Sequence, residues 1–486
     1  MCIERKNIKH ISDSTKNRTD NRKNRNLTWG IYIVAAAILM IFVPVNNVAG
    51  TGNQQPDNIP GLTNVPNYIN WILMSNFDPN TQHTISQTID VRGRKTNTPT
   101  PRPRPRPKPT HTPHTQTPIS IQTPIISIQT LNKEVQGYYP MDQITASTDY
   151  KQINYSLIST IVYGYIIVNG DGSLTKLGGS GGYDPEPVVS YAHSKGVKVT
   201  LQIIASINDL DNLLSSSTAM DTAVNNLLNE VQNQSGYTFD GIDTNFENFN
   251  YIYKNGLTTF QNKLSTKFWA NTPKWTGVSR YHMTMAIPMD SSINSNTGRY
   301  DLNSLQNYAD YVMAMGYDWY GNWEYCSTTN NAPCAGPNAP VADNNPVWPN
   351  GIVNRIHYIE TLMNKNKLLL GIPWYGYLYK AISNIRFGQL SDSNYLLTIN
   401  YGNYVNQYTN PIFDPIWETP WYAYQDNKGQ WWQAHFDNLQ SLGIKYDFVN
   451  SEGLPGIGIW NLLASINSST DVTSPDLWNL IDRKFK

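Results

Sequence analysis

Residues 240–247 carry a dense group of acidic and amide side chains and read Asp-Gly-Ile-Asp-Thr-Asn-Phe-Glu. On a β-strand, side chains two residues apart point to the same face. Asp243, Asn245 and Glu247 are therefore expected to share one face, with Thr244 and Phe246 on the other. Three polar groups on a buried strand face are costly unless they have a function. A carboxyl group at a strand end can act as a general acid, which is the chemistry of glycosidic bond cleavage.

Glu247 is the expected general acid of this group. Protonating a poor leaving group near neutral pH requires a carboxyl whose pKa is raised by burial or by a negative neighbour. Asp243 shares its face and is predicted to be that neighbour. Asp240 is out of phase with the others, unless a bulge at Gly241 turns it inward to contact substrate. No second carboxyl follows Glu247 closely enough to be an obvious nucleophile.

The chain from Glu134 onward alternates apolar strand-like segments with longer, partly helical intervals. The expected strands are Val135–Tyr139, Thr160–Val168, Val197–Ile203, Tyr237–Asn245, His282–Ile287, Tyr311–Gly316, Lys367–Ile372 and Gly456–Trp460. The expected helices lie within Val188–Lys195, Ala219–Gln232, Leu257–Phe268, Leu302–Ala309, Val353–Lys365 and Leu439–Ser451. This alternation indicates a parallel sheet, and eight units predict an α/β fold, a (β/α)8 TIM barrel with loop insertions. A doubly wound open sheet is the alternative, but the chain has no glycine-rich phosphate loop.

The barrel prediction agrees with the position of the acidic segment. Reactive residues of such barrels lie at the C-terminal ends of the strands. Residues 240–247 end the fourth expected strand, as this arrangement requires. Two insertions, Asn322–Val347 and Ala381–Glu418, have conformations that the sequence does not predict.

The segment 240–247 resembles the D-G-x-D-x-D-x-E signature of glycoside hydrolase family 18, which contains chitinases, chitobiases and spore-cortex hydrolases. One position departs from it, because the third acidic place holds Asn245. Four further segments resemble family motifs in family order: Gly137-Tyr138-Tyr139, Met313–Asp318, Leu370–Gly376 and Gly456–Trp460. The C-terminal third, including Phe436–Lys445, resembles di-N-acetylchitobiase-like members. The resemblance covers residues 134–486.

The resemblance implies a mechanism in which the substrate's 2-acetamido carbonyl is the nucleophile and the anomeric configuration is retained. Asn245 would orient the acetamido group without offering a charge to the oxazolinium intermediate. The hydroxyl of Tyr317 would bind the acetamido carbonyl. Trp460 would form the floor beneath the reacting sugar. The other residues that would contact this sugar are Met315, Asp318, Tyr138 and Tyr375. No metal and no organic cofactor is implied.

The expected partner is therefore an N-acetylglucosamine-containing oligo- or polysaccharide. The formal net charge is zero, so no global field favours nucleic acid. The chain contains 31 Tyr and 14 Trp, which suit sugar recognition but are equally ordinary core residues. A catalytically weak or inactive carbohydrate-binding member of the same barrel family is the first alternative, and Asn245 favours it. A structural envelope protein is the second. A monomer is expected.

The N-terminal third predicts export. Residues 1–50 combine a basic stretch with an apolar run from Ile31 to Val45, typical of a signal peptide cleaved after Gly50 or of an anchor through residues 29–45. The protein is then expected to be secreted or held at the cell surface. Residues 51–95 form a short region of unknown structure, and residues 96–133 form a Thr/Pro-rich spacer. In an exported protein, Cys326 and Cys334 could form a local disulfide, and their spacing suggests no metal site.

Overall fold

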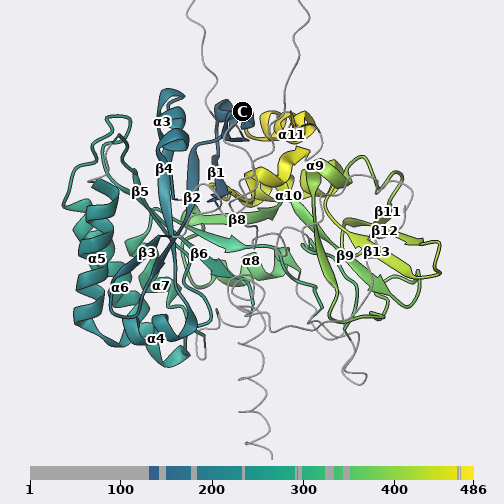
Figure 1. The fold of residues 1–486 in the computed structure, drawn as a ribbon, viewed down its shortest axis with the longest axis horizontal. Coiled ribbons are helices and arrows are strands. Elements are labelled where there is room, and N and C mark those ends of the chain that lie inside the picture. The colour runs from purple at the N-terminus through teal and green to yellow at the C-terminus, as the bar shows by residue number, and fades with distance from the viewer. Residues whose placement is uncertain are drawn as a thin grey trace, which may run out of the picture. The chain divides into compact units, whose positions relative to one another are not determined.

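The fold is a closed parallel barrel with an inserted antiparallel sheet (Figure 1). The computed structural model describes residues 131–141, 149–176, 183–232, 236–290, 293, 298–322, 333–342, 351–467, 470 and 472–486. The barrel strands are β1 (Glu134–Pro140), β2 (Thr160–Val168), β4 (Lys198–Ile204), β5 (Gly241–Thr244), β6 (His282–Pro288), β7 (Tyr311–Met315), β8 (Leu368–Pro373) and β14 (Gly456–Trp460). Strand β1 pairs in parallel with both β14 and β2, which closes the barrel. The predicted (β/α)8 barrel is confirmed.

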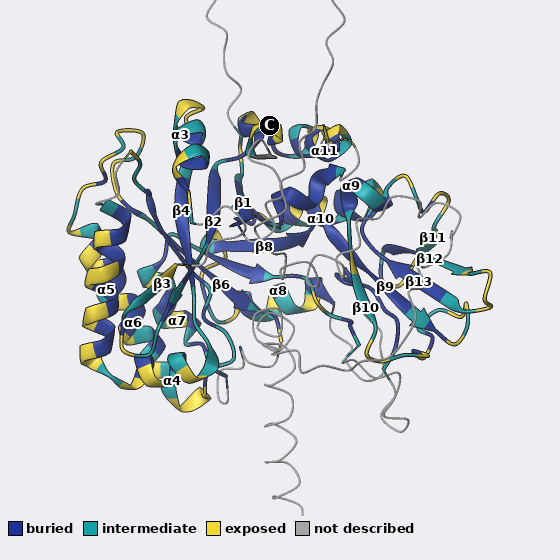
Figure 2. Ribbon diagram, viewed as in Figure 1, coloured by how far each residue is buried: buried dark blue, intermediate teal, exposed yellow. Residues whose placement is uncertain are grey.

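Helices cover the outside of the barrel strands. They are α3 (Glu186–Ser194), α4 (Ile207–Ser215), α5 (Ser217–Gln232), α6 (Lys254–Trp269), α7 (Leu302–Leu305), α8 (Ile352–Glu360), α10 (Leu439–Glu452) and α11 (Pro475–Phe485). Figure 2 shows that the barrel strands are buried. Surrounding helices such as α5 are buried on the face toward the strands and exposed on the other face. Every residue of β5 and of β8 is buried, as expected for parallel strands covered on both faces. The short strand β3 (Leu174–Lys176) pairs antiparallel with the end of β2.

A five-stranded antiparallel sheet lies between β8 and α10 in the chain. Its strands are β9 (Tyr375–Ala381), β10 (Leu396–Asn400), β11 (Ile412–Asp414), β12 (Thr419–Gln425) and β13 (Trp431–His435), in the order β10-β9-β13-β12-β11. Only Trp374 separates β9 from β8, so this sheet begins at the C-terminal end of a barrel strand. The turn α9 (Tyr401–Tyr404) follows β10, and β15 (Ile466–Asn467) pairs with β16 (Val472–Thr473). The predicted insertion Ala381–Glu418 therefore contributes strands of this sheet.

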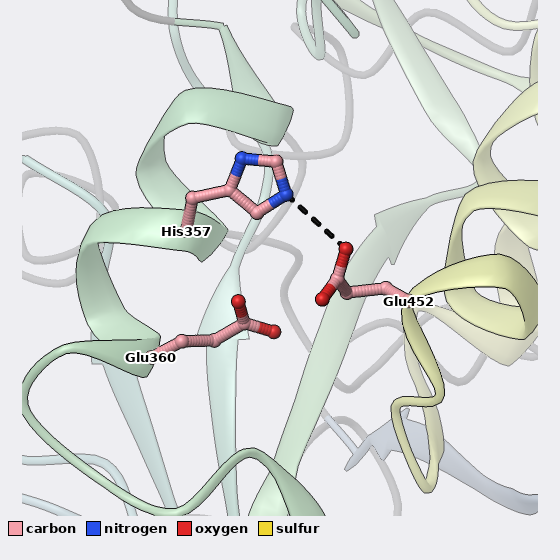
Figure 3. Close-up of side chains that lie close together, drawn as sticks. All are labelled: His357, Glu360 and Glu452. Atoms are coloured by element: carbon pink, nitrogen blue, oxygen red, sulfur yellow. Dashed lines mark hydrogen bonds and ion pairs between the residues drawn. The ribbon is translucent and has the colours of Figure 1, made fainter.

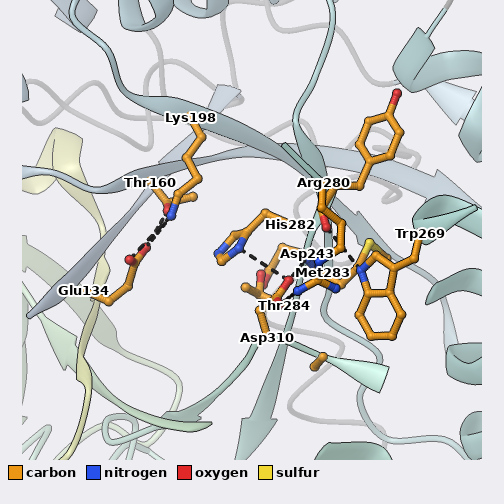
Figure 4. A network of polar contacts seen from close by, with 12 residues as sticks. Glu134, Thr160, Lys198, Asp243, Trp269, Arg280, His282, Met283, Thr284 and Asp310 are labelled. Atoms are coloured by element: carbon orange, nitrogen blue, oxygen red, sulfur yellow. Dashed lines mark hydrogen bonds and ion pairs between the residues drawn. The ribbon is translucent and has the colours of Figure 1, made fainter. Parts of the chain in front are cut away.

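The N-terminal end of the barrel interior is filled by a polar layer (Figure 4). The Glu134 carboxylate accepts hydrogen bonds from Thr160 Oγ1 at 2.5 Å and from Lys198 Nζ at 3.2 Å. Burial and the neighbouring charge of Lys198 lower the pKa of His282 well below its ordinary value. Its Nδ1 lies 3.5 Å from Asp310 Oδ2. The Lys198–Glu134 ion pair satisfies two charges that would be costly to bury unpaired.

Candidate active site

Strand β5 directs its alternate side chains as the sequence predicts. Thr244 and Phe246 point out of the barrel toward α6: Thr244 Oγ1 donates to Gln261 Oε1 at 3.2 Å, and Phe246 packs on Phe260 with ring centroids 5.3 Å apart. Asp243 points inward and is fully buried. The expected separation of the two faces is therefore confirmed for these three residues.

Asp243 lies at the centre of a hydrogen-bonded group formed by neighbouring strands. Thr284 Oγ1 donates to Asp243 Oδ1 at 2.6 Å, a contact drawn in Figure 4, and Gln202 Nε2 donates to Oδ2 at 3.2 Å. The Tyr138 hydroxyl lies 3.5 Å from Oδ1 and receives a hydrogen bond from Gln136 at 3.0 Å. Burial outweighs these donors and raises the pKa of Asp243 to about 6. The carboxyl can therefore change its protonation state near neutral pH.

Glu247 follows the strand end and has the properties of a general acid. Burial raises the pKa of Glu247 to about 7, although part of the residue reaches the surface. A hydrogen bond from the Asn245 side chain lowers this pKa, whereas the charges of Asp318 and Asp290 raise it further. Burial is the main cause, as predicted from the sequence. The prediction that Asp243 is the charged neighbour is wrong, because the charges that raise this pKa are those of Asp318 and Asp290, which follow other barrel strands.

Asn245 lies between the strand ladder and Glu247. Its backbone N–H donates to Ile203 O at 2.9 Å, which fixes the residue to β4. Its side chain hydrogen-bonds to Glu247. Its Oδ1 atom is buried and has no hydrogen-bond partner among the described residues. A buried acceptor of this kind is suited to receive an N–H group from a bound molecule.

The end of β7 brings Tyr317 and Asp318 to the same region. Burial, followed by the charges of Asp318, Glu247 and Asp243, raises the pKa of Tyr317 well above its ordinary value. Tyr317 is therefore a neutral hydroxyl donor close to all three carboxyl groups. Met315 ends the strand and packs against the cluster that contains Tyr138.

Asp318 is fixed by the inserted sheet. It has a left-handed backbone with φ of 60°, and its N–H donates to Asn338 Oδ1 at 2.7 Å. Its carboxylate accepts hydrogen bonds from the hydroxyls of Tyr375 and Tyr377, the latter at 2.5 Å. Although the residue as a whole is exposed, desolvation of its carboxyl by the surrounding side chains raises the pKa of Asp318, and these two hydroxyls oppose that change. Strand β9 therefore positions a carboxyl that follows β7 in the chain.

Trp460 packs against two clusters of the site, one that contains Tyr138 and one that contains Tyr375. It ends β14, remains partly exposed, and its ring centroid lies 5.6 Å from that of Tyr138 at an interplanar angle of 57°. It also packs against the cluster on β9 that contains Tyr375. The Tyr375 ring meets Tyr317 edge-on at 6.1 Å. The structure thus brings together most of the predicted site, namely Tyr138, Asp243, Asn245, Glu247, Met315, Tyr317, Asp318, Tyr375 and Trp460.

Asp240 is the predicted site residue that the structure places elsewhere. It precedes β5, at the opposite end of the strand from Glu247. Its Oδ2 atom accepts the Val199 N–H at 2.7 Å and lies 2.8 Å from His193 Nε2. Gly241 belongs to the regular ladder with β4 and β6, so the expected inward bulge is not formed. Asp240 therefore joins α3 and β4 rather than the site.

Four residues near the site were missed from the sequence: Gln202, Thr284, Tyr300 and Tyr377. Tyr377 had a readable signal, because Tyr375, Tyr377 and Tyr379 alternate with the period of a strand. Gln202 and Thr284 are polar residues inside apolar strand segments, the same signal that identified Asp243. Tyr300 lies outside any regular element, and no sequence pattern indicated its place near the site.

The chitobiase-like segment after β13 has a structural role. Asn438 caps α10 by accepting the Ser441 N–H at 3.1 Å, while Ser441 Oγ accepts the Asn438 N–H at 3.0 Å. Lys445 forms a fully buried ion pair with Asp437. These contacts fix the start of the helix that leads to β14. The residues that carry the resemblance in this segment therefore stabilise the fold and do not line the site.

One group of described residues has the composition of a metal site, and it lies outside the active site (Figure 3). His357 and Glu360 on α8 face Glu452 at the end of α10, and His357 Nε2 lies 3.2 Å from Glu452 Oε2. Lys365 Nζ also binds Glu452, through Oε1 at 3.2 Å and the carbonyl at 2.8 Å. A lysine already supplies positive charge to this group, so we assign it as an ion-pair network.

Several sequence predictions lie outside the described residues. They include the export segment, the region 51–95, the spacer and Cys326. Cys334 is fully buried, but its pairing with Cys326 stays a prediction. Among the described residues, no helix is both long and apolar enough to cross a membrane.

Comparisons with known proteins found a matching family, related sequences and structures of the same fold. The sequence profile of "Glycosyl hydrolases family 18" matches residues 134–464. Human di-N-acetylchitobiase is 25% identical over 332 residues, which cover 64% of this chain and 79% of that protein. A chitinase structure from Chromobacterium violaceum matches with a TM-score of 0.55 and 19% identity over 72% of this chain and 98% of its own. The spore cortex-lytic enzyme SleL of Bacillus megaterium matches with a TM-score of 0.54 and 16% identity, covering 74% of this chain and 75% of its own.

Proposed function

The chain belongs to glycosyl hydrolase family 18, and we propose that it hydrolyses β-linked, N-acetylated amino-sugar glycans with Glu247 as the general acid. One observation carries this proposal. A carboxyl with a pKa of about 7 lies beside Asn245, whose buried Oδ1 has no partner among the described residues. The acid and an acceptor for an acetamido N–H are thus adjacent, as substrate-assisted hydrolysis requires.

The proposed reaction has two steps. Protonated Glu247 donates its proton to the glycosidic oxygen while the acetamido carbonyl oxygen attacks the anomeric carbon, so the bond to the leaving sugar breaks as a cyclic oxazolinium forms. Asn245 Oδ1 accepts the acetamido N–H, and the hydroxyl of Tyr317 binds the acetamido carbonyl. Ionised Glu247 then takes a proton from water, which attacks the anomeric carbon and opens the ring. Two inversions give net retention of configuration.

The aromatic residues are proposed to hold the reacting sugar. Trp460 is partly exposed, lies against Tyr138, and offers the flat surface on which an apolar sugar face packs. Asp318 is held by two tyrosine hydroxyls and can accept a sugar hydroxyl. Glycans that this site accepts include chitin, chito-oligosaccharides and wall polymers of similar chemistry.

The carbohydrate-binding alternative leaves one feature without a role. A protein that only binds sugar needs the aromatic surface, but it does not need a buried carboxyl that is protonated near neutral pH. Keeping a carboxyl in such surroundings costs stability once the group ionises. Enzymes accept this cost at active sites because a proton donor must be available at the working pH.

The test compares the full-length wild-type chain with Glu247→Gln and with Glu360→Gln, a matched loss of a carboxyl on α8 outside the site. Each protein is incubated with N-acetylated chito-oligosaccharides and with a wall-glycan digest, and the products are followed by mass. We expect cleavage by the wild type and Glu360→Gln, and none by Glu247→Gln, which should still bind. Equal cleavage by all three proteins would refute the role of Glu247. Binding without cleavage by the wild type would favour the carbohydrate-binding alternative.

We also propose that the protein is exported, which the basic and apolar N-terminus supports, and that it is a monomer. Cell fractionation and N-terminal sequencing of the mature chain would test export, and an intact Met1 on a cytoplasmic protein would contradict it. Intact mass before and after reduction and alkylation would test the pairing of Cys326 with Cys334. Size-exclusion chromatography with light scattering would test the monomer.

A further inference from the structure

Glu247 lies on irregular backbone. Strand β5 ends at Thr244, three residues earlier. Asn248, the next residue in the chain, has a left-handed backbone with φ of 59°. The ladder hydrogen bonds that fix a strand are therefore missing where the acid is attached. The position of the acid must then depend on contacts from other parts of the chain.

Two consecutive residues, Arg299 and Tyr300, hold this irregular segment from both sides of the acid. The Tyr300 hydroxyl donates to the carbonyl of Phe246 at 2.7 Å, and Arg299 Nε donates to the carbonyl of Phe249 at 2.5 Å. The Tyr300 ring also meets the Phe249 ring edge-on at 5.7 Å. Tyr300 is only 2% exposed. The two bonded carbonyls lie on either side of Glu247 in the chain.

We propose that Tyr300, assisted by Arg299, is a positioning residue that fixes the backbone of Glu247 for proton transfer. This inference rests on the proposed function of the site. A general acid must lie within hydrogen-bond reach of the glycosidic oxygen, and a misplacement of about 1 Å can lower the rate about 100-fold. Burial and the charge of Glu247 keep the pKa of Tyr300 well above its ordinary value, so its hydroxyl stays a donor.

The variant that tests the proposal is Tyr300→Phe, which removes the hydroxyl and keeps the ring. Tyr404→Phe is its matched control. Tyr404 is 1% exposed, and its hydroxyl donates to a backbone carbonyl, that of Asp437, also at 2.7 Å. Both variants lose one buried hydrogen bond of the same kind. Only Tyr300 bonds to the segment that carries the acid.

Two measurements on the full-length proteins separate positioning from general stability. The first is kcat and KM on an N-acetylated chito-oligosaccharide, together with the melting temperature. The second is the titration of Glu247 by carbon-13 NMR of labelled glutamate carboxyls, assigned with Glu247→Gln. For Tyr300→Phe we expect kcat to fall about 10- to 100-fold with KM within about twofold. The pKa of Glu247 should fall by roughly half a pH unit or more as water reaches the loosened segment.

The control defines what would overturn the proposal. Tyr404→Phe should lower the melting temperature but leave kcat and the titration of Glu247 as in the wild type. If Tyr300→Phe also has the wild-type kcat and titration, Tyr300 supports folding only and the proposal is wrong. If the wild type cleaves no glycan, the proposed function fails by itself. The titration of Glu247 in the two variants then still decides whether Tyr300 positions the acid.

Discussion

The buried carboxyl of Glu247 should make the protein less stable as pH rises, and Glu247→Gln should remove this effect. The pKa of Glu247 is about 7 in the folded protein, against an ordinary value of 4.5. Between these values the folded protein holds a proton that the unfolded chain has lost. Stability therefore falls as pH rises through this window and is fully reduced above pH 7.

The magnitude follows from the difference of about 2.5 between the two pKa values. Each pH unit corresponds to about 1.4 kcal/mol, so the unfolding free energy loses up to about 3.4 kcal/mol. Because part of Glu247 reaches water, we expect about 2 to 3 kcal/mol. The neutral amide of the variant has no such loss, and its oxygen can still accept the Asn245 hydrogen bond.

The assay is thermal and denaturant unfolding of the wild type and Glu247→Gln from pH 4.5 to 8.5. The variant should match the wild type near pH 4.5 and melt about 3 to 4 °C higher at pH 8.5. Glu186→Gln is the control, because it removes an exposed carboxylate from the first turn of α3. An acidic side chain in the first turn of a helix is favourable, so this control, unlike Glu247→Gln, should not melt higher than the wild type at pH 8.5. A flat difference for Glu247→Gln would refute the conclusion that burial keeps this acid protonated.

Three further predictions concern the site and its scaffold. Asn245→Asp should raise kcat, because a carboxylate next to the oxazolinium stabilises its charge; an unchanged or lower kcat would show that the site is built around the amide. Cleavage measured against pH should peak between about 6 and 7, because Glu247 loses its proton above about 7 and Asp243 gains one below about 6; a profile that stays flat up to pH 8.5 would exclude Glu247 as the acid. Lys445→Ala should lower the unfolding free energy by about 3 to 5 kcal/mol, since it leaves a buried carboxylate unpaired. Lys484→Ala, which breaks an exposed pair, should cost less than about 1 kcal/mol, and equal losses in denaturant unfolding would contradict this distinction.

The barrel could be predicted from the sequence because its strands are short apolar runs separated by helical patterns. All eight expected strands are present. The fourth was expected from Tyr237 but begins at Gly241. Tyr237 and Phe239 instead pack edge-on against each other with centroids 5.6 Å apart, and Phe239 also meets Tyr163. Aromatic residues are typical of strands, so these two residues led to a predicted strand start that is too early. In the structure they pack against neighbouring rings instead.

The inserted sheet could not be predicted because its pairing is not local. Strand β9 pairs with β13, and more than 40 residues of chain lie between them. Trp374 alone separates β8 from β9, so the sequence reads as one apolar segment. The hydrogen bonds to Asp318 depend on this sheet. Sequence alone could therefore name Tyr375 and Asp318 but could not show that one holds the other.

The strand period was sufficient to select Asp243 on β5 and Asn245 and Glu247 directly after it, but it could not predict their pKa values. Alternation placed Asp243 inside the barrel and Thr244 outside it. The pKa of Glu247 depends instead on burial and on Asp318 and Asp290, which come from other strand ends. These contributions require the closed barrel. A sequence motif identifies the groups, whereas the fold determines their protonation.

The cause of the raised pKa of Glu247 determines what Asn245 changes in the site. Because burial is the main cause, an amide at position 245 leaves Glu247 a competent acid and removes only a charge beside the intermediate. Asp243 is the remaining strand carboxyl on this face, and its pKa of about 6 lies below that of Glu247. Between these two values more than half of Asp243 is ionised and more than half of Glu247 is protonated. In the proposed mechanism, Asp243 would therefore be the source of the negative charge that position 245 lacks.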